Sequence, residues 1–299
     1  MQTAIPTIYI DPGVTDAVDG TVVWSPIKSA WIGCVFAVAI VGGALTYSTE
    51  ALIVFMVTTA ITICLGHSLG MHRRFIHKSY ECPQWLEYFF VHLGVIVGLA
   101  GPIGMLQTHD TRDWAQRQPD CHPYFAHQSS FLKDGVWQLL CEVQLTNPPQ
   151  FIPELAVTAD PVYAFMQRTW ILQQLPLLVV LWLLGGASWV IWGGAVRVAV
   201  SVTGHWFIGY FAHNTGRRDW HVAGACVQGY NIPFCGLLTM GECWHNNHHA
   251  FPGSAKLGLK WNQCDPGWWA LCALKKSGLV WNLKLPSDLP DRENLFRFR

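Results

Sequence analysis

Three histidines fall within five residues of the stretch Gly241-Glu242-Cys243-Trp244-His245-Asn246-Asn247-His248-His249-Ala250-Phe251-Pro252. On a helix, His245 and His249 lie about 40° apart around the axis, and His248 lies about 60° to the other side of His245. One helical turn therefore directs three imidazoles toward one region. Neutral imidazole is a ligand for iron, zinc, copper and nickel. Surface histidines without a joint role are the alternative, which the other histidine clusters of this chain disfavour.

The composition indicates an integral membrane protein. The 299 residues are 51% hydrophobic and 13% charged, whereas charged residues make up about a quarter of a soluble domain. The mean hydropathy is +0.25. The formal net charge is zero, so no nucleic acid partner is expected. The ten cysteines include no Cys-x-x-Cys pair, which argues against an iron–sulfur centre and a disulfide framework.

Four long apolar stretches predict four transmembrane helices, each long enough to cross about 30 Å of hydrocarbon. The last two are separated by a turn predicted at Gly193-Gly194. A further apolar stretch, Trp85 to Gly104, is expected to lie at the inner leaflet without crossing. The predicted fold is a single all-α integral membrane domain, residues 1–299, whose helical cap carries the histidines. The expected spans are 29–47, 51–70, 170–192 and 195–213, and the expected cap comprises 71–168 and 214–299.

The basic residues predict the orientation. No Lys or Arg occurs between Ser29 and His72, and Arg73, Arg74 and Lys78 then follow together. Because cytoplasmic segments carry the excess of Lys and Arg, the cap is expected to be cytosolic. Arg197 is an exception, since a turn at Gly193-Gly194 would put it near the outer interface.

Eleven of the thirteen histidines fall in four clusters. Imidazoles at or near membrane depth are costly and usually functional. One cluster contains two overlapping His-x4-His patterns, and another begins with His109. The clustered histidines are His67, His72 and His77; His109, His122 and His127; His205 and His213; and His245, His248 and His249.

These motifs resemble those of the membrane-bound fatty acyl desaturases, the acyl-CoA and acyl-lipid desaturase family. Gly241 to Pro252 is similar to that family's third histidine box nearly letter for letter. His72-Arg73-x-x-x-His77-x-Ser79-Tyr80 resembles the first box, and Trp206-Phe207 followed by His213 resembles its last span. The likeness covers roughly residues 30–285, and the third box is very specific.

The resemblance implies a set of metal ligands with two departures. The second box reads His109-Asp110-Thr111-Arg112-Asp113, so Arg112 and Asp113 stand where the family has histidines, and Gly209 replaces a frequent asparagine. Asp113 could supply a carboxylate to iron, whereas Arg112 cannot ligate a cation and is expected to pair with Asp113 or Asp110. Seven histidines match family ligands: His72, His77, His109, His213, His245, His248 and His249. Four others are candidates to fill the gaps or to support the ligands: His67, His122, His127 and His205.

The resemblance also implies the chemistry. Removing hydrogen from an unactivated methylene needs oxygen activated at a metal, because acid–base side chains cannot do it. We therefore expect oxygen-dependent desaturation of a fatty acyl chain at two iron ions. A separate electron donor of the ferredoxin or cytochrome b5 type is expected, with the active site on the cytosolic side of a bacterial inner membrane or the endoplasmic reticulum. The alternatives are a related lipid hydroxylase or oxygenase, and a non-catalytic lipid-binding membrane protein that holds zinc.

Overall fold

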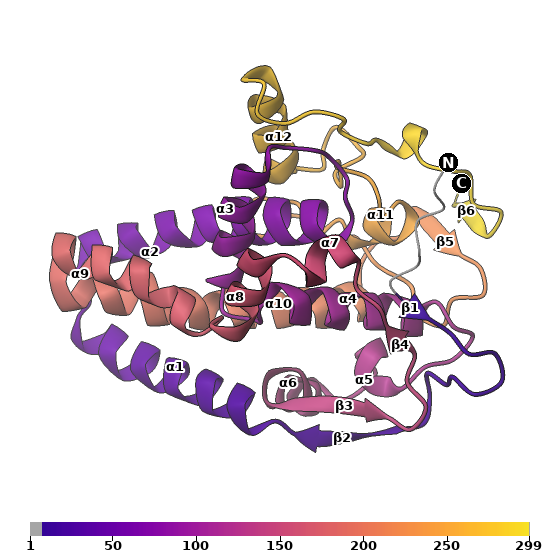
Figure 1. The fold of residues 1–299 in the computed structure, drawn as a ribbon, viewed down its shortest axis with the longest axis horizontal. Coiled ribbons are helices and arrows are strands. Elements are labelled where there is room, and N and C mark those ends of the chain that lie inside the picture. The colour runs from indigo at the N-terminus through magenta and orange to yellow at the C-terminus, as the bar shows by residue number, and fades with distance from the viewer. Residues whose placement is uncertain (1–7, 299) are drawn as a thin grey trace.

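The computed structural model describes residues 8–298, so residues 1–7 and 299 of the predicted domain lie outside the described part. The described chain is mostly helical (Figure 1). Three antiparallel strand pairs accompany the helices: β1 (Ile8–Tyr9) with β4 (Gln150–Phe151), β2 (Gly20–Trp24) with β3 (Cys141–Leu145), and β5 (Trp220–Val222) with β6 (Leu295–Arg297). The helices are α1 (Pro26–Leu45), α2 (Thr49–Ile61), the π-helix η1 (Thr62–Ile76), α3 (Gln84–Val95), α4 (Pro102–Gln116), α5 (Pro123–Ala126), α6 (Phe131–Leu140), α7 (Leu155–Thr158), α8 (Pro161–Arg168), η2 (Leu172–Gln174), α9 (Leu175–Val190), the π-helix η3 (Ile191–Val196), α10 (Arg197–Asn214), α11 (His245–Ala250), α12 (Pro266–Lys276) and η4 (Pro286–Asp288).

Three helical segments of the described chain are long and apolar enough to cross a membrane: Pro26–Leu45, Thr49–Ile76 and Leu172–Asn214. In Figure 1, α1, α2 and α9 extend to one side, while α11 and the strands β1, β5 and β6 lie at the other end. Apolar side chains on the extended part are open to the surroundings; Leu45 is 80% exposed and Leu183 is 76% exposed. Side chains of this kind are stable when lipid covers them.

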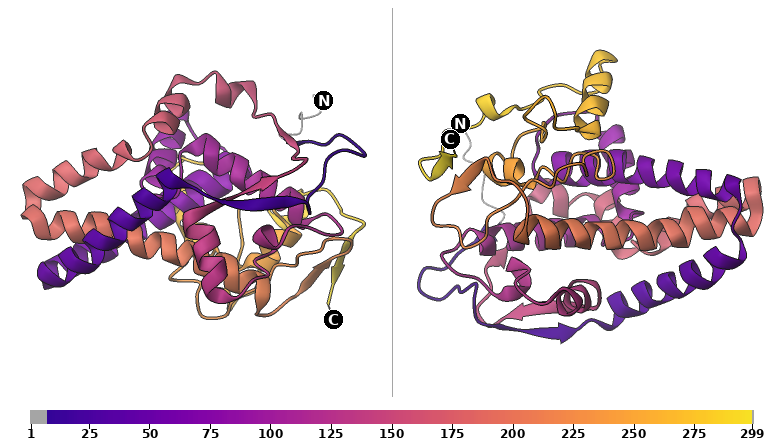
Figure 2. Two further views of the ribbon diagram at one scale, coloured as in Figure 1. Left: turned by 90° about the horizontal axis from the view of Figure 1, so that it is seen from below. Right: turned by 180° about the vertical axis from the view of Figure 1, so that it is seen from behind.

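The third of these segments folds back on itself at Gly186. Gly186 has φ 63° and ψ −153°, a conformation that glycine adopts readily because it has no Cβ. Figure 2 shows the chain running out along α9 and returning along α10. The predicted turn at Gly193-Gly194 is therefore wrong. A Cβ on Gly193 would lie 2.7 Å from a methyl carbon of Leu181. The absence of a side chain at Gly193 therefore lets the helical stretches before and after Gly186 pack closely.

The position of the turn changes the place of Arg197. Its side chain is 0% exposed, in contrast to the expected position near the outer interface. The guanidinium donates from Nε to the Gly193 carbonyl at 2.7 Å, from Nη1 to the Ile96 carbonyl at 2.7 Å and from Nη2 to Gln174 Oε1 at 2.6 Å. Ile96 follows α3, whose C-terminal end carries partial negative charge. Arg197 thus joins α10 to the end of α3 inside the helix bundle.

The apolar stretch from Trp85 to Gly104 forms α3 and the start of α4, and neither helix is among the three candidate spans. Instead, α3 packs against η1 at very short range. A Cβ on Gly66 would lie 2.3 Å from the Leu93 carbonyl carbon, and one on Gly70 would lie 2.4 Å from the Phe90 carbonyl oxygen. The two backbones can approach this closely only because glycine has no side chain.

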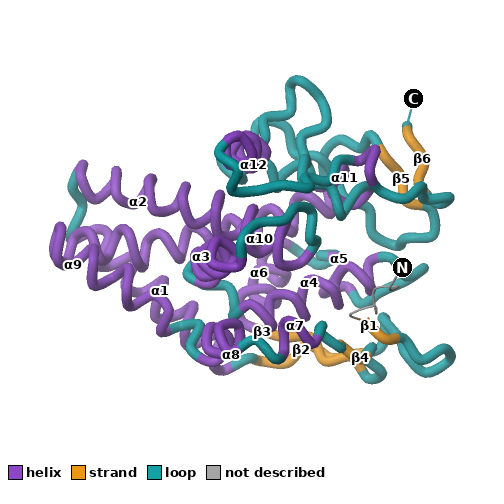
Figure 3. The backbone as a smooth tube through the Cα atoms, turned by 45° about the horizontal axis from the view of Figure 1, so that its top comes forward, coloured by secondary structure: helices purple, strands orange, loops and turns teal. Residues whose placement is uncertain are grey.

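Two clusters of buried side chains lie on either side of this contact. One cluster of buried side chains joins η1 and α3 to α12, through residues such as Leu69, Phe90 and Leu271. A second cluster joins the other side of η1 and α3 to α4 and α8, through residues such as Phe75 and Tyr163. The segments between α10 and α12 consist mainly of loops around the short helix α11 (Figure 3). The best-packed helices therefore hold the C-terminal end of η1 in a fixed position.

Candidate metal centre

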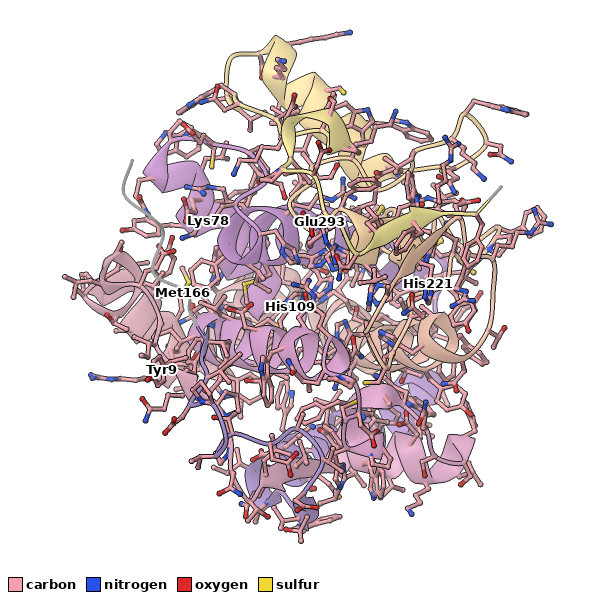
Figure 4. The ribbon with its side chains drawn as sticks, turned by 90° about the vertical axis from the view of Figure 1, so that its right-hand side faces the viewer. Tyr9, Lys78, His109, Met166, His221 and Glu293 are labelled. Carbon is pink, nitrogen blue, oxygen red and sulfur yellow. The ribbon has the colours of Figure 1, made fainter. Side chains whose placement is uncertain are left out.

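Four histidines from three separate segments converge on one point. His72 lies in η1, His77 directly follows η1, His109 lies in α4 and His248 in α11. One ring nitrogen from each lies within 4.8 Å of the others. Two buried ring nitrogens of these residues have no partner, His77 Nε2 and His248 Nδ1, whereas His109 Nδ1 lies 3.6 Å from Asp110 Oδ1. Figure 4 shows nitrogen atoms gathered beside His109 in the middle of the molecule. We refer to these residues as the four-histidine group.

The π-helical form of η1 explains why histidines five residues apart meet. In a π-helix each turn closes with an i→i+5 hydrogen bond, whereas residues five apart in an α-helix are about 140° apart around the axis. The rings of His67 and His72 are parallel within 6°, with centroids 6.4 Å apart. The centroids of His72 and His77 are 4.7 Å apart. Both overlapping His-x4-His patterns therefore lie along one side of the segment, and the second of them belongs to the four-histidine group.

A second group consists of His213, at the end of α10, with His245 and His249 of α11. The Nε2 atom of His245 lies 3.1 Å from that of His213 and 3.1 Å from that of His249. The Nε2 atoms of His213 and His249 are 3.4 Å apart. We refer to these residues as the three-histidine group.

The nitrogen separations fit a metal ion. Imidazole nitrogens that ligate one ion at about 2.1 Å are about 3.0–3.4 Å apart when they occupy neighbouring coordination positions. A buried nitrogen without a hydrogen-bond partner destabilises a folded protein. Binding of a cation to these nitrogens would therefore stabilise it. Both observations show that the residues present suit metal ions.

The short helix α11 contributes to both groups. Its three histidines point to neighbouring regions rather than to one, since His248 belongs to one group and His245 and His249 to the other. The ring centroids of His245 and His248 are only 5.5 Å apart. The helix is held by Asn246, whose side chain donates to the Trp220 and Gly229 carbonyls, both at 2.9 Å.

Burial keeps the imidazoles of α11 neutral. Loss of solvent holds the pKa of His245 and of His248 well below the usual value. Burial also lowers the pKa of His249 to about 4, against the opposing effect of Asp113. At His109 burial acts in the same direction, but Asp113 and Asp110 outweigh it and raise the pKa. A neutral imidazole has a free lone pair for a metal, so three of these shifts favour ligation.

The two residues that replace family histidines have different surroundings. The Arg112 guanidinium lies 3.0 Å from His127 Nε2 and donates to Gln138 Oε1 at 2.7 Å. Asp113 forms an ion pair with Arg117, with 2.9 Å between Asp113 Oδ2 and Arg117 Nη2. Neither metal group includes Asp113, although its charge acts on His109 of one group and His249 of the other.

The four remaining candidate histidines lie around the groups. The rings of His67 and His205 are 5.0 Å apart. The ring of His127 is parallel within 5° to that of His213, 5.2 Å away, and its Nδ1 lies 3.0 Å from Asp134 Oδ2. His122 Nδ1 accepts a hydrogen bond from the Tyr124 backbone amide at 3.1 Å. His122 thus has a local structural contact, His67 and His127 lie beside His72 and His213, and His205 contacts His67.

Three polar residues at the centre were not singled out from the sequence. Glu242 Oε2 lies 2.7 Å from His72 Nδ1, and Glu242 Oε1 accepts from Ser68 at 2.6 Å. Asp134 is 0% exposed and accepts from Trp206 Nε1 at 2.9 Å. Gln116 is 1% exposed and lies beside His213. The sequence could have pointed to Gln116, because it lies seven residues after His109 and residues seven apart share a helix face.

A cleft of about 540 Å³ reaches the four-histidine group from the surface. Its lining is partly apolar, with residues such as Phe75, Leu106 and Trp114, and partly charged. His77 and Asp113 also line it, so this cleft connects His77 of the four-histidine group to the exterior.

The family model for fatty acid desaturases matches residues 48–282. The chain belongs to the fatty acid desaturase family. It is similar to an sn-1 stearoyl-lipid 9-desaturase of Anabaena variabilis, with 32% identity over 261 residues, covering 85% of this chain and 94% of that relative. An sn-2 palmitoyl-lipid 9-desaturase of Nostoc sp. (strain 36) is 30% identical over 79% of this chain and 81% of its own length. An acyl-CoA C20 Delta5-desaturase of Anemone leveillei is 29% identical over 84% and 80%. The expected family and enzyme class, an oxidoreductase of fatty acyl chains, are confirmed.

Proposed function

We propose that this desaturase introduces a carbon–carbon double bond into a fatty acyl chain with O2 as co-substrate and two iron ions as cofactor. One iron ion would be held by the four-histidine group and the other by the three-histidine group, with Asp113 as an additional ligand. Bound iron would supply the oxygen activation that removes hydrogen from a methylene, which no side chain can do. The rest of the site binds and orients the substrate.

The observation that carries this proposal is the convergence of seven imidazoles into two adjacent groups inside a membrane-type helical fold. One metal ion could not use all seven nitrogens, and their arrangement in two sets supports two ions. Burial excludes water from the ligands and favours the neutral forms of the three α11 histidines. A redox-inert zinc ion would satisfy the same nitrogens, so the identity of the metal is the point to test.

The topology and partners belong to the same proposal. Four crossings, formed by α1, by α2 with η1, and by the two arms on either side of Gly186, would place both metal groups on the cytosolic side. The cluster of Arg73, Arg74 and Lys78 at the end of η1 supports this orientation. Electrons would come from a separate ferredoxin or cytochrome b5. Labelling of a cysteine placed at Lys133 by a membrane-impermeant reagent from the outside of intact cells would contradict the orientation.

Expression in a host that lacks the activity, followed by mass spectrometry of its fatty acids, tests the reaction. A product two mass units lighter than its precursor is expected, with a double bond at one position. A product sixteen units heavier would identify a hydroxylase instead. Metal analysis of the purified protein should find close to two irons per chain. Stoichiometric zinc without turnover would favour a lipid-binding protein that holds zinc.

A further inference from the structure

Gln116, in the last turn of α4, directs an amide N–H at the three-histidine group. Its Nε2 atom donates to the Phe125 carbonyl at 2.7 Å and lies 3.2 Å from His213 Nε2. The contact with Phe125 defines which way the amide faces, because a carbonyl oxygen accepts only from the nitrogen. One proton of the NH2 group is thus used by Phe125, and the other is available to the histidine.

The tautomer of His213 follows from its other contact. Its Nδ1 atom lies 2.6 Å from the Gly209 carbonyl oxygen, so Nδ1 carries the proton and Nε2 carries the free lone pair. Without a metal, that lone pair accepts the second N–H of Gln116. The same lone pair is the one that would ligate a metal ion, because His245 and His249 present their Nε2 atoms to the same point.

Metal binding therefore takes the acceptor away from Gln116. A neutral imidazole nitrogen has one lone pair, which cannot serve a metal and an N–H donor together. The amide is 1% exposed, so water from bulk solvent does not replace the acceptor, and a buried donor without a partner is costly. A new acceptor has to come from inside the site.

We propose that the second N–H of Gln116 holds a small oxygen-atom or anionic ligand at an open coordination position of the three-histidine group. This inference rests on the proposed metal site. Three protein ligands leave open positions at a non-haem iron ion, and one remains open at a five- or six-coordinate ion even if Asp113 adds a fourth ligand. A ligand there would lie near the metal-facing side of His213. Gln116 is thus a positioning residue for the ligand that occupies this place.

The neighbouring polar residues do not perform this task. Arg112 directs its guanidinium to His127 and Gln138. The carboxylate of Asp113 pairs with Arg117 at 2.9 Å, and a carboxylate accepts hydrogen bonds but does not donate them. The backbone of Gln116 is also held, because its main-chain carbonyl accepts from the Val227 amide at 3.2 Å.

Azide is a suitable probe, because it binds ferric iron only at an open position and accepts hydrogen bonds. The full-length iron-loaded protein is oxidised, and azide is titrated while the azide-to-iron absorption band is recorded. Gln116→Met keeps a side chain of similar length without the N–H. We expect the same iron content and an azide dissociation constant about 10-fold higher than in the wild type, as for loss of one hydrogen bond to a charged group. The matched control is Gln118→Met, since Gln118 follows α4 and donates back to the Trp114 carbonyl at 3.0 Å, and the azide affinity of this variant should not change.

A measurement on the wild type keeps the inference testable if Gln116→Met does not fold. The resonance Raman stretch of bound azide should shift between H2O and D2O, because an exchangeable amide proton touches it. An unchanged stretch, or unchanged azide affinity in Gln116→Met with two irons present, would overturn the inference. Loss of one iron in Gln116→Met would also overturn it, since Gln116 would then support the metal itself. Absence of iron from the wild type would instead contradict the proposed function.

Discussion

The Nδ1 atom of His72 lies 2.7 Å from the Oε2 atom of Glu242. This contact joins the end of η1 to the segment that leads into α11, two parts of the chain that are far apart in sequence. Glu242 is held in turn by Ser68, which donates to its other oxygen at 2.6 Å. A carboxylate that accepts a hydrogen bond from one imidazole nitrogen orients the ring and leaves the other nitrogen free to ligate a metal.

Glu242→Gln is therefore expected to weaken iron binding in the four-histidine group by about 10- to 100-fold, because the amide is a poorer acceptor for His72. The measurement is iron content per chain as a function of free iron concentration. Glu154→Gln is the matched control, since Glu154 forms a half-exposed ion pair with Lys78. Equal iron affinity in the two variants would show that Glu242 does not support the ligand.

Gly70→Ala should destabilise the protein by on the order of 3 kcal/mol, because the new methyl group would lie 2.4 Å from the Phe90 carbonyl oxygen. Gly33→Ala in α1 is the control, with nothing within 4 Å of its Cβ; it should be neutral or slightly stabilising, since alanine favours helix. Thermal unfolding of the detergent-purified variants measures the difference. Similar unfolding temperatures would mean that η1 and α3 are further apart than the structure shows.

Arg197→Met removes a buried cation that makes three hydrogen bonds. It leaves the Ile96 carbonyl and Gln174 without this donor, so we expect a loss of stability of on the order of 3 kcal/mol. Arg168→Met serves as the control, because Arg168 is exposed at the end of α8. The readout is again thermal unfolding in detergent. An Arg197→Met variant as stable as the control would place Arg197 outside the helix bundle.

Asp113→Ala should lose iron and activity together, and Asp113→His should keep part of both, if the carboxylate ligates iron. Arg117→Gln separates this role from the ion pair, because it removes the partner at 2.9 Å and leaves the carboxylate in place; it should keep its iron. His122→Ala should also keep its iron, since His122 contacts the Tyr124 amide. Iron content is measured in all four variants. Full iron in Asp113→Ala would show that the histidines suffice.

Local features of the sequence were enough to predict the family and the long apolar helices, and to single out seven histidines that the fold gathers into two groups. Hydropathy over a window of one helix length identifies apolar segments regardless of their neighbours. The spacing of His245, His248 and His249 describes a single helical turn, and α11 has this form. The histidine motifs are short, so their chemistry is readable without knowledge of distant contacts.

The tertiary structure alone decided which histidines share a group and where the chain turns. The turn lies at Gly186, and Gly193, where the sequence also allowed a turn, packs against Leu181 of α9 instead. The π-helical form of η1, which aligns residues five apart, coincides with its close contact to α3. The partners of Arg112, Gln116 and Arg197 lie on other helices or in other segments. Periodicity and motif spacing describe one segment at a time, whereas these contacts join separate segments, so only the folded chain could reveal them.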